Sequence, residues 1–299
     1  LSIPIGLIGD GIVPGSIAIT KSTATFSDVK VNDSIGTIIH NELPSPWQPN
    51  KLVGYYSNDV DLHVVNKRFS GKVIDQSVIG NHAQALNTVT LGSFPLQGSL
   101  TKTAGFQFGF MGNSYVRIKN HEDQNPHPSD DFAISTWVTV PSQSLAIGVA
   151  SKFIISKRRQ SSELRGNART GLTTITDVIE SRPNWPYELG YMPVVGKLYA
   201  STSDGTTTWT ITSSALVNDG LARHVCISRE SNDFTFWVSG SSQGTRQIST
   251  KSTYNEADIF LGTYDTTLGA SAFSGSIDEF RIYLGTTPVQ SDIDQFNTI

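Results

Sequence analysis

The 299-residue sequence contains a single cysteine, Cys226, so it can form neither an internal disulfide nor a cysteine metal cluster. Secreted β-domains often carry disulfides, and their absence favours a chain that folds in a reducing cytoplasm. Charged residues make up only 16% of the chain and the net charge is −4. This balance excludes a globally basic nucleic-acid binder and a highly charged disordered chain. No apolar run approaches about 18 residues, so we expect no transmembrane helix and no membrane insertion.

Threonine, serine, glycine and β-branched residues are plentiful, whereas helix-forming runs of Ala, Leu, Glu and Lys are scarce. This composition favours strands and turns. Short β-rich runs, mostly bounded by Gly, Asn, Asp or Ser, predict strands at residues 51–57, 105–110, 114–118, 132–140, 196–202, 208–213, 224–230, 234–240, 257–264 and 276–284. So many strands predict a two-sheet sandwich. The one expected helix is the last, with Thr287 as its cap and Pro288 at its first position.

Residues 1–50 differ from the rest of the chain. They contain short β-prone pieces and then a proline-rich exit with Pro44, Pro46 and Pro49. Such an exit is typical of an extended connector. We therefore interpret residues 1–50 as an arm that packs on its own domain or docks to a partner subunit.

The order of motifs carries a family resemblance. The runs are LVGYYSNDVD, GKVIDQSVIGNHAQALNTVTL, GFQFGFMGNSYVRI, DDFAISTWVTVP, FIISK, YELGYMPVVGKLYASTSDG, SALVNDGLARHVCISR, FTFWVSG, ADIFLGTY and FSGSIDEFRIYLGTTPVQSDI. In this order, residues 51–299 resemble the laminin-G-like, concanavalin A-like jelly-roll modules. The resemblance implies an all-β, two-sheet antiparallel jelly-roll sandwich with a short C-terminal helix. The segment at about 156–186 is longer than the family needs, which predicts an insertion.

Modules of this family are mostly non-catalytic, and many hold one structural Ca²⁺. The resemblance implies such a site at Asp75, Asn81 and Asp278, because calcium takes hard oxygen ligands and glycine-rich turns expose carbonyls. The alternative is that Asp75 and Asn81 are Asx-turn residues and that Asp278 accepts from a buried backbone N–H. Glu279 and Arg281 lie two residues apart, so we expect them to form an exposed ion pair.

Candidate ligand contacts come from a basic run and from nearby aromatics. Residues 152–169 carry six basic residues against one acidic residue. This run suits an acidic polysaccharide, phosphates or an acidic partner, and the alternative is a solvated loop or an assembly contact. Aromatic rings near loops can stack on sugars, and we expect Trp185 to be the best exposed of them. No aromatic is interleaved with the basic run, which argues against nucleic acid. The predicted ligand-binding residues are Trp185, Tyr187, Tyr191, Arg158, Arg159 and Arg165.

Catalytic motifs are missing from the sequence. It contains no Glu-x-Asp-x-x-Glu on a predicted strand, no Gly-x-Ser-x-Gly, no P-loop and no His-Glu-x-x-His. We therefore expect no enzyme, but a glycan-binding recognition module on a virion or another extracellular surface. The alternative is a structural particle component, such as a capsid decoration, tail or fibre subunit, that self-associates and docks to other subunits through residues 1–50. A second alternative is an accessory carbohydrate-binding domain of a larger enzyme.

Overall fold

The computed structural model describes residues 2–4, 16–18, 49–56, 68–73, 75–93, 106–111, 114–142, 150–158, 184–249, 253–264 and 271–296. Residue contacts divide the chain into two units, residues 1–44 with 59–62 and residues 45–58 with 63–299. In the first unit, β1 (Ser2–Pro4) pairs antiparallel with β2 (Ser16–Ala18). The remainder of the predicted arm, apart from the start of the short turn η2 (Pro49–Lys51), lies outside the described residues, as does most of the predicted insertion.

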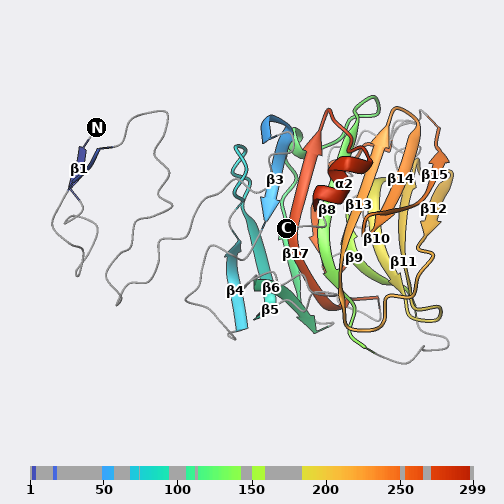
Figure 1. The fold of residues 1–299 in the computed structure, drawn as a ribbon, viewed down its shortest axis with the longest axis horizontal. Coiled ribbons are helices and arrows are strands. Elements are labelled where there is room, and N and C mark those ends of the chain that lie inside the picture. Colours follow the sequence, from blue (N-terminus) through green and yellow to red (C-terminus); the bar gives the residue numbers. More distant parts are fainter. Residues whose placement is uncertain are drawn as a thin grey trace, which may run out of the picture. The chain divides into compact units, whose positions relative to one another are not determined.

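The second unit is an antiparallel β-sandwich (Figure 1). Its first layer contains β12 (Thr208–Thr212), β11 (Lys197–Ser203), β10 (Trp185–Met192), β9 (Lys152–Ser156), β16 (Ile259–Leu261) and β7 (Tyr115–Ile118), in that spatial order. Its second layer contains β6 (Phe106–Met111), β17 (Ser274–Leu284), β8 (Phe132–Thr139), β13 (Ala222–Glu230), β14 (Asp233–Val238) and β15 (Ser241–Gln247), with β3 (Leu52–Tyr56) beside β17. The jelly-roll sandwich expected from the sequence is confirmed.

Two long strands each pair with three neighbours, and the first of them, β5, connects the two layers. β5 (Ala83–Ser93) pairs with β7 through its first half and with β6 through its second half, and β4 (Arg68–Val73) lies along its other edge. β17 pairs with β8 along one edge and with β6 and then β3 along the other. A bulge at Glu279, which has a φ of 50°, lets β17 change partners.

Apolar side chains from both layers meet in one core. The ring of Phe132 on β8 lies 5.8 Å from the ring of Tyr187 on β10, which joins the two layers directly. Within the second layer, Tyr56 stacks on Phe280 at 6.0 Å. On β14, one of the strands expected from the sequence, the rings of Phe234 and Phe236 are fully buried in this core.

Strand β10 corrects a prediction. Trp185, Tyr187 and Tyr191 were expected near loops, but they lie on a strand whose residues are almost all buried. Tyr187, Leu189 and Tyr191 alternate with period 2 and point into the core, which is why the segment forms a strand. Strand β15 was also missed, because its sequence SSQGTRQ is entirely polar and mostly exposed.

The helix α2 (Gln290–Phe296) lies over the second layer (Figure 1). Its Ile293 belongs to a buried cluster with side chains of β3, β8, β13 and β17. The helix begins two residues after Pro288, later than predicted, and the Asp292 carboxylate accepts from the Val289 N–H. Neither this helix nor any other helix in the described residues is long and apolar enough to cross a membrane.

The ion pair of Glu279 and Arg281 is buried, not exposed as expected. Its atoms lie 2.8 Å apart and the side chains are only 4% and 2% exposed. The guanidinium also lies over the Tyr55 ring. Beside this pair, Asp278 accepts from the Glu279 N–H at 2.8 Å. These charges are part of the packed structure of the sheet.

Gly275 on β17 marks a close approach of two backbones. A Cβ at this position would lie 2.5 Å from the carbonyl oxygen of Thr139 and 2.2 Å from the Phe273 ring. We expect Gly275→Ala to lower the free energy of unfolding by about 1–3 kcal/mol, because the pairing of β17 with β8 must shift. Urea denaturation measures this. Ser274→Ala, at the exposed neighbour on the same strand, serves as the control, and equal effects of both changes would contradict the prediction.

Candidate functional site

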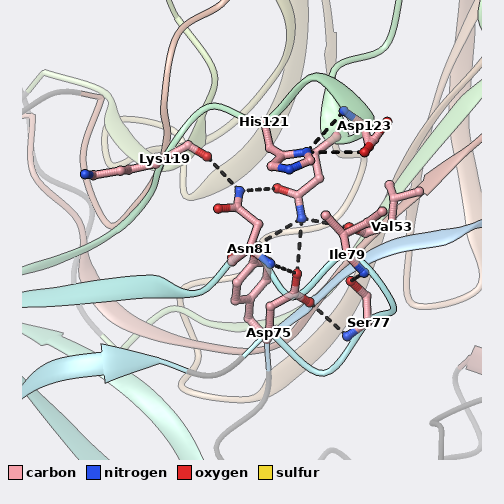
Figure 2. A network of polar contacts seen from close by, with 10 residues as sticks. Val53, Asp75, Ser77, Ile79, Asn81, Lys119, His121 and Asp123 are labelled. Atoms are coloured by element: carbon pink, nitrogen blue, oxygen red, sulfur yellow. Dashed lines mark hydrogen bonds and ion pairs between the residues drawn. The ribbon is translucent and has the colours of Figure 1, made fainter.

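The turn between β4 and β5 is organised around the carboxylate of Asp75 (Figure 2). Its Oδ1 accepts from the N–H groups of Tyr55 at 3.0 Å and Ser77 at 2.9 Å. Its Oδ2 accepts from the Asn81 N–H at 2.9 Å and from Gln124 Nε2 at 3.3 Å. One buried carboxylate therefore holds the turn closed and fastens it to strand β3.

Asn81 and Gln124 extend this network to the short helix η4 (Glu122–Gln124). Asn81 Nδ2 donates to the Lys119 carbonyl and to Gln124 Oε1, each at 2.8 Å (Figure 2). Gln124 Nε2 also donates to the Val53 carbonyl at 2.7 Å. Burial and the nearby charge of Asp75 raise the pKa of Tyr56, whose hydroxyl donates to the Asn81 carbonyl.

The predicted calcium ligands are brought together only in part. Asp75 and Asn81 are hydrogen-bonded neighbours, whereas Asp278 lies on β17 and accepts from its own next residue. A carboxylate has about four acceptor sites, and all four on Asp75 receive N–H donors, so a cation would have to displace them. Within the described residues, no group of three or more His, Cys, Asp or Glu side chains could hold a metal. The three residues as folded do not fit a cation, and calcium binding stays an untested prediction.

The Asp75 network predicts a stability effect that needs no metal. We expect Asp75→Asn to lower the free energy of unfolding by about 2 kcal/mol, because the amide nitrogen faces N–H donors that a carboxylate oxygen accepted. The control is Asp123→Asn, an exposed carboxylate in the same network. Denaturation with added calcium and with a chelator should give the same loss. A loss seen only with calcium present would support the metal site instead.

A second polar cluster lies on the outer face of the first layer. Because Tyr187, Leu189 and Tyr191 point inward from β10, Glu188 and Gly190 point outward. Strand register places two rows of outward residues across β9, β10, β11 and β12. The rows are Ser156, Glu188, Ser201 and Thr210, and Phe153, Gly190, Tyr199 and Thr212. The Tyr199 ring covers Gly190 so closely that a Cβ there would lie 2.3 Å from it.

Arg158, just after β9, completes this cluster. Its guanidinium lies 3.9 Å from the centroid of the Trp185 ring and 5.6 Å from that of Phe153. Its Nε lies 3.4 Å from Glu188 Oε2. Trp185 is 4% exposed and donates through Nε1 to the Ser201 hydroxyl at 3.1 Å. The arginine is therefore held between aromatic rings and a carboxylate.

Glu188 is the buried acid of the cluster. Ser201 and Tyr199 donate to its Oε1 at 3.2 and 3.4 Å. Its Oε2 is buried and receives no hydrogen bond from the described residues, although Arg158 lies beside it. Burial raises the pKa of the Glu188 carboxyl, and the charge of Arg158 and the two hydroxyl donors offset this only in part.

The predicted ligand residues are thus divided among three places. Trp185 and Arg158 come together on the outer face, but the expected exposed ring is instead covered by the guanidinium. Tyr187 and Tyr191 are in the core at 0% and 1% exposure, because their strand alternation points them inward. Arg159 and Arg165 lie outside the described residues.

Sequence reasoning missed Glu188, Tyr199 and Ser201. The signal that could have found them is the alternation in WPYELGYM and KLYASTS, in which polar or small residues separate the apolar ones.

The buried carboxylate predicts a pH effect on stability. A raised folded-state pKa means that the folded chain holds this proton more tightly than the unfolded chain does. The stability that this tighter proton binding contributes is present below the ordinary glutamate pKa, about 4.3. It is lost as the pH rises through the raised pKa of Glu188. We therefore expect the stability of Glu188→Gln relative to the unchanged chain to increase with pH, measured by thermal denaturation.

Asp219 provides a control for which the opposite change of stability with pH is expected. A hydrogen bond from Arg223 lowers the pKa of Asp219, so its contribution is present at neutral pH and lost on acidification. Asp219→Asn should lose stability relative to the unchanged chain as the pH rises. A Glu188→Gln difference that is independent of pH would contradict the assignment.

Comparison with known proteins agrees with this architecture. A sequence model of the concanavalin A-like lectin/glucanases superfamily matches residues 110–290. The chain belongs to this superfamily. No curated protein sequence matches the chain significantly.

Among solved structures, similar folds include two toxin binding domains. The binding domain of Paraclostridial mosquitocidal protein 1 aligns with a TM-score of 0.59 at 15% identity, over 84% of this chain and 52% of that one. The binding domain of botulinum neurotoxin DC in complex with SialylT aligns at 0.52 and 13%, over 84% and 51%. The present chain thus spans about half the length of those two binding domains.

A third similar fold is domain 4 of AbnA, an extracellular GH43 arabinanase of Geobacillus stearothermophilus, in complex with arabinotriose. It aligns with a TM-score of 0.50 at 16% identity, over 83% of this chain and 98% of that domain. At these identities, the three likenesses show the fold.

Proposed function

We propose that the chain is a non-catalytic recognition module that binds an oligosaccharide on the outer face of β9–β12. The observation that carries this proposal is the composition of that face. It combines the ring of Phe153, the stacked pair of Arg158 and Trp185, and the exposed threonine hydroxyls of β12. Sugar recognition uses these same elements, since apolar ring faces meet C–H groups and polar side chains meet hydroxyls.

Exposure supports the outer part of this face as the contact surface. Thr208, Thr210 and Thr212 on β12 are all exposed, and they lie beside Ser203, Ser201 and Tyr199 of β11. A ligand would therefore meet this edge of the face first.

The number of carboxylate side chains on this face favours binding of an oligosaccharide over its cleavage. A glycosidase normally uses a pair of carboxylates. Among the described outward positions in the register of β9–β12, Glu188 is the single carboxylate.

Similar folds support the same class of ligand. The arabinanase domain, which this chain covers almost completely in length, was solved with arabinotriose, and one toxin binding domain was solved with SialylT. The chain spans only about half of the toxin domain, so the arabinanase domain is the more direct comparison.

The test is a screen of the purified chain against neutral and acidic oligosaccharides, arabino-oligosaccharides included. We expect specific binding that Thr210→Tyr abolishes or greatly weakens, because the ring fills the exposed end of the face. Val78→Tyr is the matched control, since Val78 is 83% exposed on the Asp75 turn. Binding that survives Thr210→Tyr, or is lost equally in Val78→Tyr, would place the ligand elsewhere. No binding to any glycan would refute the function.

The setting of the module is a second proposal. We propose that it belongs to a virion or another extracellular assembly, with residues 1–50 docking to neighbouring subunits. This is supported by the residue contacts, which group residues 1–44 with residues 59–62 as a unit of their own. Deletion of residues 1–50 should then leave the sandwich folded and abolish incorporation into the particle. Normal incorporation of the shortened chain would contradict docking through the arm and leave an accessory domain of a larger enzyme as the alternative.

A further inference from the structure

The guanidinium of Arg158 has donors that the fold leaves unused. Its Nε is buried beside Glu188, but within the described residues its two terminal nitrogens make no hydrogen bond. The side chain is 28% exposed while the Glu188 side chain is 3% exposed. The end-on edge of the guanidinium, formed by the two terminal nitrogens, is therefore the part that a ligand can reach.

The position of this guanidinium is fixed before any ligand arrives. It is stacked 3.9 Å from the Trp185 centroid, and the indole is itself anchored by its hydrogen bond to Ser201. A planar guanidinium with a free end-on edge matches a carboxylate through two parallel N–H···O bonds. Because the arginine loses little further freedom on binding, such a contact is favourable even near the surface.

Glu188 lies beside the inner part of the guanidinium. Its Oε2 is buried 3.4 Å from Arg158 Nε, so it helps to hold the guanidinium in place and does not face a ligand. A ligand carboxylate would therefore meet the terminal nitrogens of Arg158.

From this geometry we propose that the outer face of β9–β12 binds a sugar carboxylate. Its ligand is then an oligosaccharide that contains uronic or similar sugar acids. The inference rests on the proposed function, since it names the ligand class of the same face. It assigns Arg158 as the specificity-determining residue and Trp185 as the residue that positions it.

The experiment compares an oligogalacturonate with its methyl ester, which keeps every hydroxyl and removes the charge. Isothermal titration of the full chain should show the acid binding about tenfold or more tightly than the ester, the size expected for a charge-assisted pair of hydrogen bonds. Arg158→Gln should weaken binding of the acid by a much larger factor than binding of the ester, and so remove most of that preference. Arg158→Lys should restore only part of it, because an ammonium cannot form the bidentate contact.

Arg246→Gln is the matched control, because it removes the same charge from an exposed position on β15 and should leave the preference intact. Thermal denaturation verifies that each variant is folded. Equal affinities for acid and ester, or an equal loss of both in Arg158→Gln, would overturn the carboxylate inference while the oligosaccharide function stands. If neither these ligands nor any other glycan bound, the proposed function itself would fail, and the inference with it.

Discussion

The packing of β10 against the opposite layer is the constraint on which the candidate site depends. Tyr187 meets Phe132 across the core, and Leu189 and Tyr191 continue the same inward face. Because side chains alternate along a strand, this packing forces Glu188 and Gly190 outward. The outward glycine leaves room for the Tyr199 ring, and the outward acid draws Arg158 onto Trp185. The site is thus a consequence of how the core is packed.

Buried charge has a different role in the rest of the sandwich. Asp75 fastens a turn with four accepted hydrogen bonds, and the Glu279–Arg281 pair lies within the second layer. Asp75 is matched on both oxygens by donors inside the chain, which is what burial of a charge requires. Glu188 differs from Asp75 because one of its oxygens receives no hydrogen bond from the described residues.

The fold could be predicted from the sequence because alternation of apolar and polar residues along a strand shows which side chains face the core. β14 is an example, with Phe234 and Phe236 inward and Thr235 outward. The site could not be read in the same way. Trp185 and Arg158 were both singled out, but only the register across β9, β10 and β11 shows that they stack on each other. The exposure of an aromatic ring depends on which residue of another segment covers it, and the composition of the sequence does not predict that residue.

The most direct test of the account is to map ligand contacts by NMR, following backbone amide shifts while an acidic oligosaccharide is added. We expect the largest changes on the amides of β10, β11 and β12 around Glu188, Ser201 and Thr210. Changes centred instead on the Asp75 turn or on helix α2 would contradict the assignment of the binding face.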